Sequence, residues 1–220
     1  MSGPVEPRDP ERMLSLAYAA ARDRGALAAL WALDDALAAS VQAGRDPNLR
    51  ELRLTWWFEA LERLDRTPAP DQPLLALIAA ELLPRGVSGA ALATMIDGWD
   101  VLLNPDPLSE GGMLAYAEGR GRLFTLAGAA LGGGTVPLAA AGQGWALADL
   151  ARHSTGSEAA RAAALAAPLL GGALRPRWPR RLRALGMVAA LAARDLARPD
   201  EARGAPRRIA RMLLYKLTGR

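Results

Sequence analysis

The stretch NLRELRLTWWFEALERL, residues 48–64, carries two apolar stripes side by side and charged residues at regular intervals. At helical spacing, the first stripe consists of Leu49, Leu52, Trp56 and Ala60. The second consists of Leu54, Trp57, Phe58, Leu61 and Leu64. Two stripes need two packing partners, so we expect this helix to lie inside a helical bundle with other helices around it.

The composition of the chain favours helices throughout. Hydrophobic residues make up 51% of the 220 positions, and most of them are alanine and leucine, which are strong helix formers. β-Branched residues are scarce, so a sheet has little to be built from. We therefore predict an all-α, single-domain helical bundle of about nine to ten helices.

Capping and helix-breaking residues place the ends of these helices. Asp9 is expected to cap a helix that begins at Pro10 and runs to about Arg24, where Gly25 breaks it. Ser88 and Ser109 are expected to cap two later helices. The helices expected after Gly25 span 26–43, 48–64, 74–83, 89–103, 109–131, 137–153, 157–170, 179–197 and 207–217.

Glycines interrupt the helix that contains Tyr116. Gly119, Gly121 and Gly128 each weaken a helix by about 1 kcal/mol relative to alanine. Glycine in such a position usually marks a place where two helices approach closely. We predict close helix contacts at these three residues.

Several classes of site and segment are excluded by residue counts. The chain has no cysteine, which excludes disulfides, thiolate metal sites and cysteine nucleophiles, and its single histidine, His153, cannot form a multi-histidine site. Residues 1–8 lack the basic start and apolar core of a signal peptide and are expected to be disordered. No uninterrupted apolar run is long enough to span a bilayer. We expect a cytoplasmic protein.

Basic residues are concentrated toward the C-terminus. From Arg161 onward there are 14 basic and 3 acidic residues, whereas the preceding part has 13 basic and 20 acidic ones. Aromatic interleaving and nucleic-acid motifs are missing, so we expect no nucleic-acid partner. The helical domain is expected over 9–200 and a basic helix over 201–220, which suits contact with an acidic protein partner or with the inner face of a membrane.

The segment Pro47–Leu61, PNLRELRLTWWFEAL, resembles the P-x-L-G-E-I-R-L-Q-W-W-R-E-A-L segment of bacterial squalene/phytoene synthase-like proteins. The resemblance extends to MIDGWDVLLNPDPLSEGGMLAYAEGRGRLFTLAGAALG at 95–132, and more weakly to GALAALWAL at 25–33 and MLLYKLTGR at 212–220. It covers about 25–220 and implies the isoprenoid synthase fold. An active member joins two prenyl diphosphates, and facing Asp-x-x-x-Asp motifs hold the Mg²⁺ ions that assist departure of the diphosphate.

The positions that match the family's catalytic motifs carry other residues. Trp31 takes the place of the motif tyrosine, and Ala38 and Gln42 take the places of the first aspartate pair. In the second motif Asp149 and Arg152 are retained or nearly so, but Ala146 replaces the glutamine, and His153 and Ser157 stand where the aspartates belong. Tyr116 matches the first tyrosine of a third motif, and Gly119 replaces the second. We therefore assign no catalytic residue.

Other acidic residues are weaker candidates for a metal site. Asp34 and Asp35 are adjacent and point about 100° apart on a helix, so they cannot chelate one ion together. Asp97 and Asp100 face the same way and are the best remaining pair. The residues expected to line the former pocket are Trp31, Asp34, Ala38, Trp56, Tyr116, Glu118, Asp149 and Arg152.

The resemblance implies a pseudoenzyme, a protein that has lost prenyl diphosphate condensation and acts in lipid binding or assembly. The assembly role follows a mitochondrial group of the family that assists respiratory complex I assembly and is likewise degenerate at the aspartates. No cofactor is expected, and an isoprenoid or lipid is the expected ligand. The alternative is an active prenyltransferase of isoprenoid biosynthesis that uses relocated acidic residues and Mg²⁺.

Overall fold

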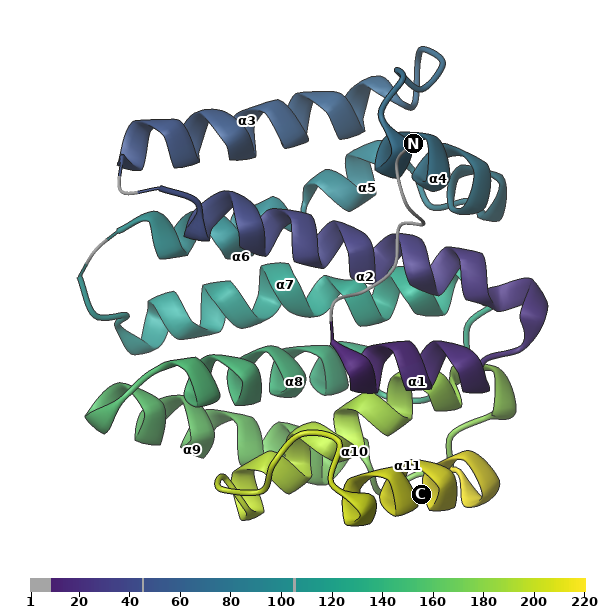
Figure 1. Cartoon of the computed structure of the whole chain (residues 1–220), viewed down its shortest axis with the longest axis vertical. Helices are drawn as coiled ribbons and strands as arrows, with labels where there is room; N and C mark the ends of the chain where they lie inside the picture. Colours follow the sequence, from purple (N-terminus) through teal and green to yellow (C-terminus); the bar gives the residue numbers. More distant parts are fainter. Residues whose placement is uncertain (1–8, 45, 105) are drawn as a thin grey trace.

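A computed structural model of the chain describes residues 9–44, 46–104 and 106–220, and these residues form helices and no strand (Figure 1). The all-α prediction is confirmed. The α-helices are α1 (Pro10–Tyr18), α2 (Ala21–Gln42), α3 (Pro47–Arg63), α4 (Pro73–Glu81), α5 (Gly89–Ala93), α6 (Ile96–Asp100), α7 (Glu110–Ala130), α8 (Leu138–His153), α9 (Gly156–Ala173), α10 (Arg183–Ala197) and α11 (Pro206–Thr218). Short 3-10 helices, η1 to η3, span Leu83–Arg85, Val101–Leu103 and Arg180–Leu182.

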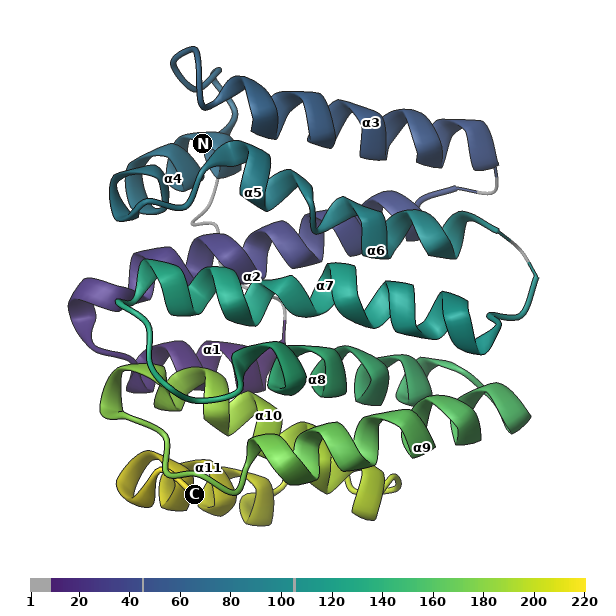
Figure 2. The same ribbon diagram turned by 180° about the vertical axis from the view of Figure 1, so that it is seen from behind.

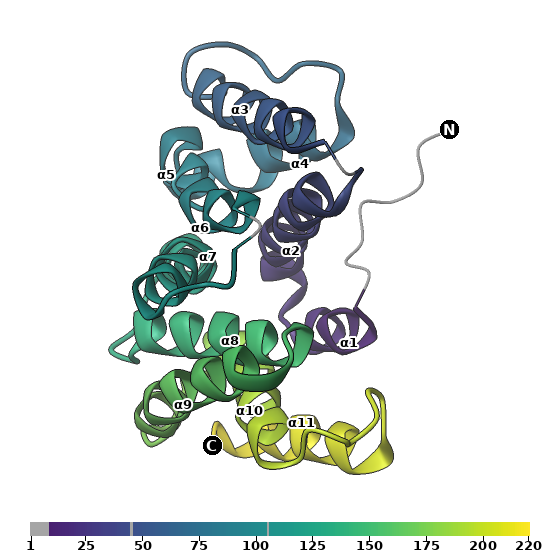
Figure 3. The same ribbon diagram turned by 90° about the vertical axis from the view of Figure 1, so that its left-hand side faces the viewer.

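The long helices are stacked along the long axis of the molecule (Figures 1 and 2). α3 forms one end with α4 and α5, while α10 and α11 form the opposite end (Figure 3). Between these ends, α2 packs against α3, α4 and α7, and α8 packs between α7 and α9. Helices at the centre of such a stack can enclose a space, because each of them turns one face toward it.

Aromatic rings join the central helices. Trp31 of α2 contacts Phe124 of α7 and Trp145 of α8 edge-on, with ring centroids 6.3 and 5.4 Å apart. All three side chains are buried. Edge-to-face aromatic pairs stabilise a core beyond their buried area, so this cluster fixes how α2, α7 and α8 pack.

Helix starts follow the predicted caps. The side chain of Asp9 accepts hydrogen bonds from the backbone N–H groups of Glu11 and Arg12. Ser88 accepts from Ala91, and Ser109 accepts from Gly112. The expected helix over 89–103 is divided into α5, α6 and η2, which brings the α-helices of the described residues to eleven.

The predicted break at Gly25 is wrong. α1 ends at Tyr18, and α2 begins at Ala21 and continues through Gly25. The guanidinium of Arg24 donates to the carbonyl oxygens of Ala17 and Ala19, which satisfies the open end of α1. Gly25 instead allows close approach of α4, since a Cβ there would lie 2.3 Å from Cδ of Glu81.

The position predicted for the tryptophan-rich helix is also wrong in part. α3 lies at one end of the molecule rather than at its centre (Figure 1). Its second stripe packs inward through Leu54, Trp57, Leu61 and Leu64. Ala60 of the first stripe is buried as well, whereas Phe58 of the second stripe is exposed. Leu49, Leu52, Trp56 and Phe58 are exposed by 49%, 63%, 46% and 39%.

The prediction for residues 1–8 falls outside the described part of the chain. The basic C-terminal segment packs on the domain, because α11 contacts α10. Within the described residues, no single helix has the length and apolar character to cross a bilayer. The bent pair Pro73–Arg85 and Gly89–Leu103, with 116° between its halves, meets that criterion by length and composition only.

The predicted close helix contacts at the glycines of α7 are confirmed. A Cβ on Gly119 would lie 2.2 Å from the backbone nitrogen of Gly98 in α6, and one on Gly121 would lie 2.6 Å from the backbone nitrogen of Gln143 in α8. A Cβ on Gly128 would lie 2.2 Å from Cδ1 of Leu138. The backbones of α6, α7 and α8 therefore touch where only glycine fits.

Replacing Gly119 with alanine is expected to lower the free energy of unfolding by about 1–3 kcal/mol, because two backbones must separate. The matched control is Gly111→Ala in the first turn of α7, where the new Cβ would meet only Oγ of Ser109, at 3.9 Å. There we expect a gain of up to about 1 kcal/mol from helix propensity. Urea unfolding followed by circular dichroism measures both, and equal effects would contradict the close contact.

Candidate functional site

A cavity of about 410 Å³ lies between the central helices. Its walls come from α1, α2, α6, η2, α7 and α8, and from the segment that joins α10 to α11. The volume is within the range of small-ligand pockets, roughly 300–1,000 Å³. The lining residues are Asp9, Pro10, Arg12, Asp35, Ala38, Ala39, Gln42, Trp99, Leu102, Tyr116, Arg120, Asp149, Leu150, His153 and Arg203.

Helical spacing places one row of side chains from each long helix in this cavity. On α2 the cavity is lined by Asp35, by Ala38 and Ala39 three and four residues later, and by Gln42. This spacing places them on one face of the helix. Tyr116 and Arg120 on α7 have the same relation, as do Asp149 and His153 on α8. Gln42 and His153 are exposed, so they lie where the cavity meets solvent.

Arg120 is the buried cation at the base of the cavity. Its Nε and Nη2 donate to the two carboxylate oxygens of Asp34, at 2.9 and 3.0 Å. Its Nη1 donates to the hydroxyl of Tyr116 and to Oδ2 of Asp149, each at 2.5 Å. The guanidinium also lies 4.6 Å from the ring of Trp99 and 4.4 Å from that of Trp145. Each of its three nitrogens thus donates to a fixed partner.

Two glycines bring Arg120 into this position. Gly119 contacts the backbone of α6 and Gly121 contacts the backbone of α8. The side chain between them enters the space where α6, α7 and α8 meet. A residue placed there is buried whatever its polarity, which explains why Arg120 is only 3% exposed.

Arg12 of α1 is a second buried cation, next to Arg120. Its Nη1 lies 3.1 Å from Oδ2 of Asp34 and 2.9 Å from Oδ1 of Asp35. Its guanidinium lies 4.7 Å from the ring of Trp31 and 5.3 Å from that of Trp145. One guanidinium thus contacts both adjacent carboxylates.

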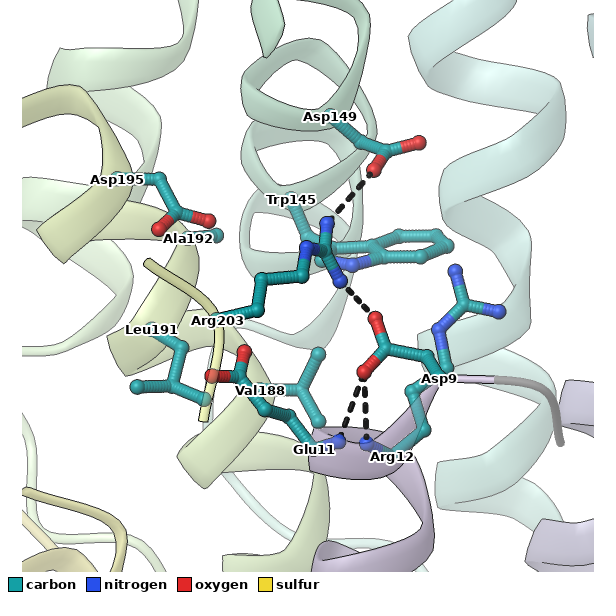
Figure 4. Close-up of a pocket in the computed structure, with 10 residues that line it drawn as sticks. All are labelled: Asp9, Glu11, Arg12, Trp145, Asp149, Val188, Leu191, Ala192, Asp195 and Arg203. Atoms are coloured by element: carbon teal, nitrogen blue, oxygen red, sulfur yellow. Dashed lines mark hydrogen bonds and ion pairs between the residues drawn. The ribbon is translucent and has the colours of Figure 1, made fainter. Parts of the chain in front are cut away.

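Arg203 links the cavity to a smaller pocket of about 30 Å³ (Figure 4). Its guanidinium lies between Asp149 and Asp9 in front of the indole of Trp145, donates to Asp9, and is 3.8 Å from Oδ1 of Asp149. The small pocket has room for a water molecule or two, because one needs roughly 10–15 Å³. Arg203 therefore lines both pockets.

The arginines fix the charge states of their neighbours. Burial works against ionisation of Asp149, but Arg120 outweighs it and lowers the pKa of Asp149 to about 2. Burial raises the pKa of Tyr116 above its ordinary value, which keeps the phenol neutral. The pKa of Arg120 is raised because the charges of Asp34 and Asp149 outweigh the effect of burial. The site is a network of compensated charges at neutral pH.

This residue set does not fit the Mg²⁺ cluster that the resemblance implies for an active enzyme. Within residues 9–44, 46–104 and 106–220, no group of three or more histidine, cysteine, aspartate or glutamate side chains is placed to hold a metal ion. Each cavity carboxylate faces an arginine: Asp9 faces Arg203, Asp35 faces Arg12, and Asp149 faces Arg120. A guanidinium occupies the oxygens that a divalent cation would need.

Comparison of the chain with protein-family models, with curated proteins and with solved structures finds no match. The resemblance therefore rests on the quoted residues alone.

The structure brings several predicted pocket residues together. Ala38, Tyr116 and Asp149 line the cavity, and Gln42 and His153, which match motif aspartates, reach the same space from α2 and α8. Asp34 is fully buried under Arg12 and Arg120. Trp31 lies behind the wall, against Arg12.

Three predicted lining residues lie elsewhere. Trp56 borders a separate space of about 230 Å³ beside α3, because its helix is at the end of the molecule. Arg152 borders another space, of about 280 Å³, and is 3.1 Å from Asp195. Glu118 is exposed and pairs with Arg122, four residues along α7.

The weak metal candidates also lie outside the cavity. Asp97 and Asp100 are exposed on α6. Asp97 is 3.9 Å from Nη1 of Arg122. The surface of α6 that carries both acids faces away from Trp99, which lines the cavity.

Sequence reasoning missed the residues that dominate the site. Arg12, Trp99, Arg120, Trp145 and Arg203 were not predicted to take part. A local signal existed only for Arg120, because it stands between two glycines that mark close contacts. The others depend on neighbours distant in sequence; Arg120 and Asp34, for example, are 86 residues apart.

Proposed function

We propose that this chain is a non-catalytic protein of the squalene/phytoene synthase type that binds an isoprenoid or another lipid chain in the central cavity. The observation that carries the proposal is the pairing of every cavity carboxylate with arginine. Positions expected to hold aspartates for Mg²⁺ carry Ala38, Gln42 and His153, and all three line the same cavity.

The arginines themselves are a poor substitute for metal ions. A diphosphate could in principle bind to Arg12 and Arg120, since guanidinium groups bind phosphate well. Both are already paired with Asp34, which has no exposed surface. Withdrawing them would leave a buried carboxylate without compensation, at a cost of several kcal/mol. A charged diphosphate is therefore disfavoured.

An uncharged chain suits the remaining walls. The apolar part of the lining consists of Pro10, Ala38, Ala39, Trp99, Leu102 and Leu150. A ligand with an apolar chain would bury that chain against these walls.

Farnesol is a suitable probe for binding, read from the fluorescence of the tryptophans at the cavity. We expect Ala38→Phe to weaken farnesol binding by about tenfold or more, because the ring fills the cavity. Ala151→Phe is the matched control, since Ala151 borders the separate 280 Å³ space. Absence of binding to the unmodified protein, or equal loss in both variants, would contradict the proposal.

Catalysis is tested separately with labelled farnesyl and geranylgeranyl diphosphate and Mg²⁺. We expect no hydrocarbon product. A product that disappears in Asp97→Asn or Asp100→Asn would establish the alternative, an active prenyltransferase with relocated acids. A product that persists in both variants would also overturn the non-catalytic assignment.

A further inference from the structure

α11 carries two faces of opposite kind. Arg208, Met212 and Tyr215 are buried against the domain. The opposite face is apolar although it points outward: Ile209, Leu213, Leu214 and Leu217 are exposed by 36%, 40%, 50% and 72%. A helix that packs against a domain normally turns polar residues outward, so this face needs a partner.

Basic residues flank the apolar row on both sides. At 100° per residue, Arg207 and Arg211 lie along one edge of the row and Lys216 lies along the other. The segment 206–220 contains no acidic residue, and Arg220 follows the helix. The face therefore combines apolar side chains with positive charge alone.

The segment before α10 adds positive charge at the end of α11. Nε of Arg177 donates to the carbonyl oxygen of Thr218 at 2.7 Å, and the backbone N–H of Trp178 donates to Gly219 at 2.8 Å. Arg177 and Arg180 are both exposed. The basic surface thus continues from α11 onto this segment.

The domain holds α11 in a fixed orientation. Nη1 of Arg183 donates to the carbonyl oxygens of Lys216 and Leu217, at 2.7 and 2.9 Å. Nε and Nη2 of Arg208 donate to the carboxylate of Glu11 in α1, at 2.6 and 2.7 Å. α11 lies along the outer end of the molecule, with no other helix beyond it (Figures 1 and 3).

We propose that α11 docks this protein on the surface of an anionic lipid bilayer. The apolar row lies in the boundary between headgroups and acyl chains, and the flanking basic residues contact lipid phosphates. A second copy of the chain is a poor occupant, because pairing two such faces brings arginines against arginines. An interfacial helix needs an apolar outward face with cationic edges, and α11 has both.

α3 also exposes large apolar side chains and serves as a comparison for α11. Leu49, Leu52 and Trp56 lie among three acidic and three basic residues: Arg50, Glu51, Arg53, Glu59, Glu62 and Arg63. This part of α3 therefore lacks the positive charge that an anionic surface would select. α3 also lies at the opposite end of the molecule, so a bilayer that contacts α11 does not reach it (Figure 3).

The test is flotation of the full chain with vesicles of phosphatidylcholine alone or with about one-third phosphatidylglycerol, at low and high salt. We expect binding to the anionic vesicles only, and less of it at high salt. Leu217→Glu should weaken binding about tenfold or more, whereas Leu52→Glu, at the 63% exposed leucine of α3, should not. Arg207→Gln should weaken it about fivefold, and Arg66→Gln, an exposed arginine near the end of α3, should not.

Circular dichroism confirms that each variant is folded. Equal binding to neutral vesicles, or equal loss in the α11 and α3 variants, would overturn the proposal. Analytical ultracentrifugation tests whether a second copy of the chain covers this face. A dimer that dissociates in the Leu217→Glu variant would show that a second copy, and not a bilayer, is the partner.

Discussion

Replacing Arg120 with methionine is expected to lower the free energy of unfolding by about 3–5 kcal/mol, because it removes one partner of a buried ion pair. Asp34 would keep Arg12 as its remaining cationic contact. Asp149 and the hydroxyl of Tyr116 would lose their hydrogen bonds to the guanidinium. Since domains are stable by roughly 5–15 kcal/mol, this is a large fraction of the total. Urea unfolding followed by circular dichroism measures the loss.

Arg122→Met is the control for this prediction, since it makes the same substitution two residues away. The side chain of Arg122 is 35% exposed, and its ion pairs with Asp97 and Glu118 are 3.9 and 3.4 Å long. Exposed pairs of this kind contribute about 0–1 kcal/mol. A loss of less than about 1 kcal/mol for Arg120→Met would mean that the buried network does not hold the central helices together.

Replacing Arg208 with methionine is expected to cost a similar amount, about 3–5 kcal/mol, but to act first at one end of the molecule. Arg208 is 1% exposed and joins α11 to Glu11 of α1 and to Asp195 of α10. Both carboxylates would lose a buried partner. Amide hydrogen exchange should show lost protection in α11 before the central helices are affected.

Arg207→Met is the control, because Arg207 is the exposed neighbour of Arg208. We expect it to leave hydrogen exchange in α11 unchanged. Unchanged protection in both variants would show that α11 is held by its apolar contacts through Met212 and Tyr215, and not by the ion pairs. In that case the fixed orientation of the docking face would need another explanation.

The two networks have one physical feature in common. Arg120 joins helices of the central bundle, and Arg208 joins the C-terminal helix to the start of the chain. In both places a single guanidinium satisfies carboxylates from two other helices, since it has five donors in a planar fork. Around Arg120 the same property occupies Asp149, which lines the cavity, and so connects the stability of the fold to the loss of catalysis that we propose.

The sequence by itself determined the elements and many of their ends. Alanine and leucine content fixed the all-α class, Asp9, Ser88 and Ser109 fixed helix starts, and the glycines of α7 marked close helix contacts. These signals are local, because capping and helix propensity depend on residues within a turn or two of each other. Gly25 is an exception, since it permits contact with α4 and does not end a helix.

Only the tertiary structure decided which apolar stripe of α3 is covered, which carboxylates meet which arginines, and which residues share a cavity. Leu52 and Leu61 are alike in sequence, yet the first is 63% exposed and the second is fully buried. Arg208 meets Glu11 across 197 residues. Such pairings depend on how whole helices are placed against one another, and helical periodicity says which residues share a face without saying what lies opposite it.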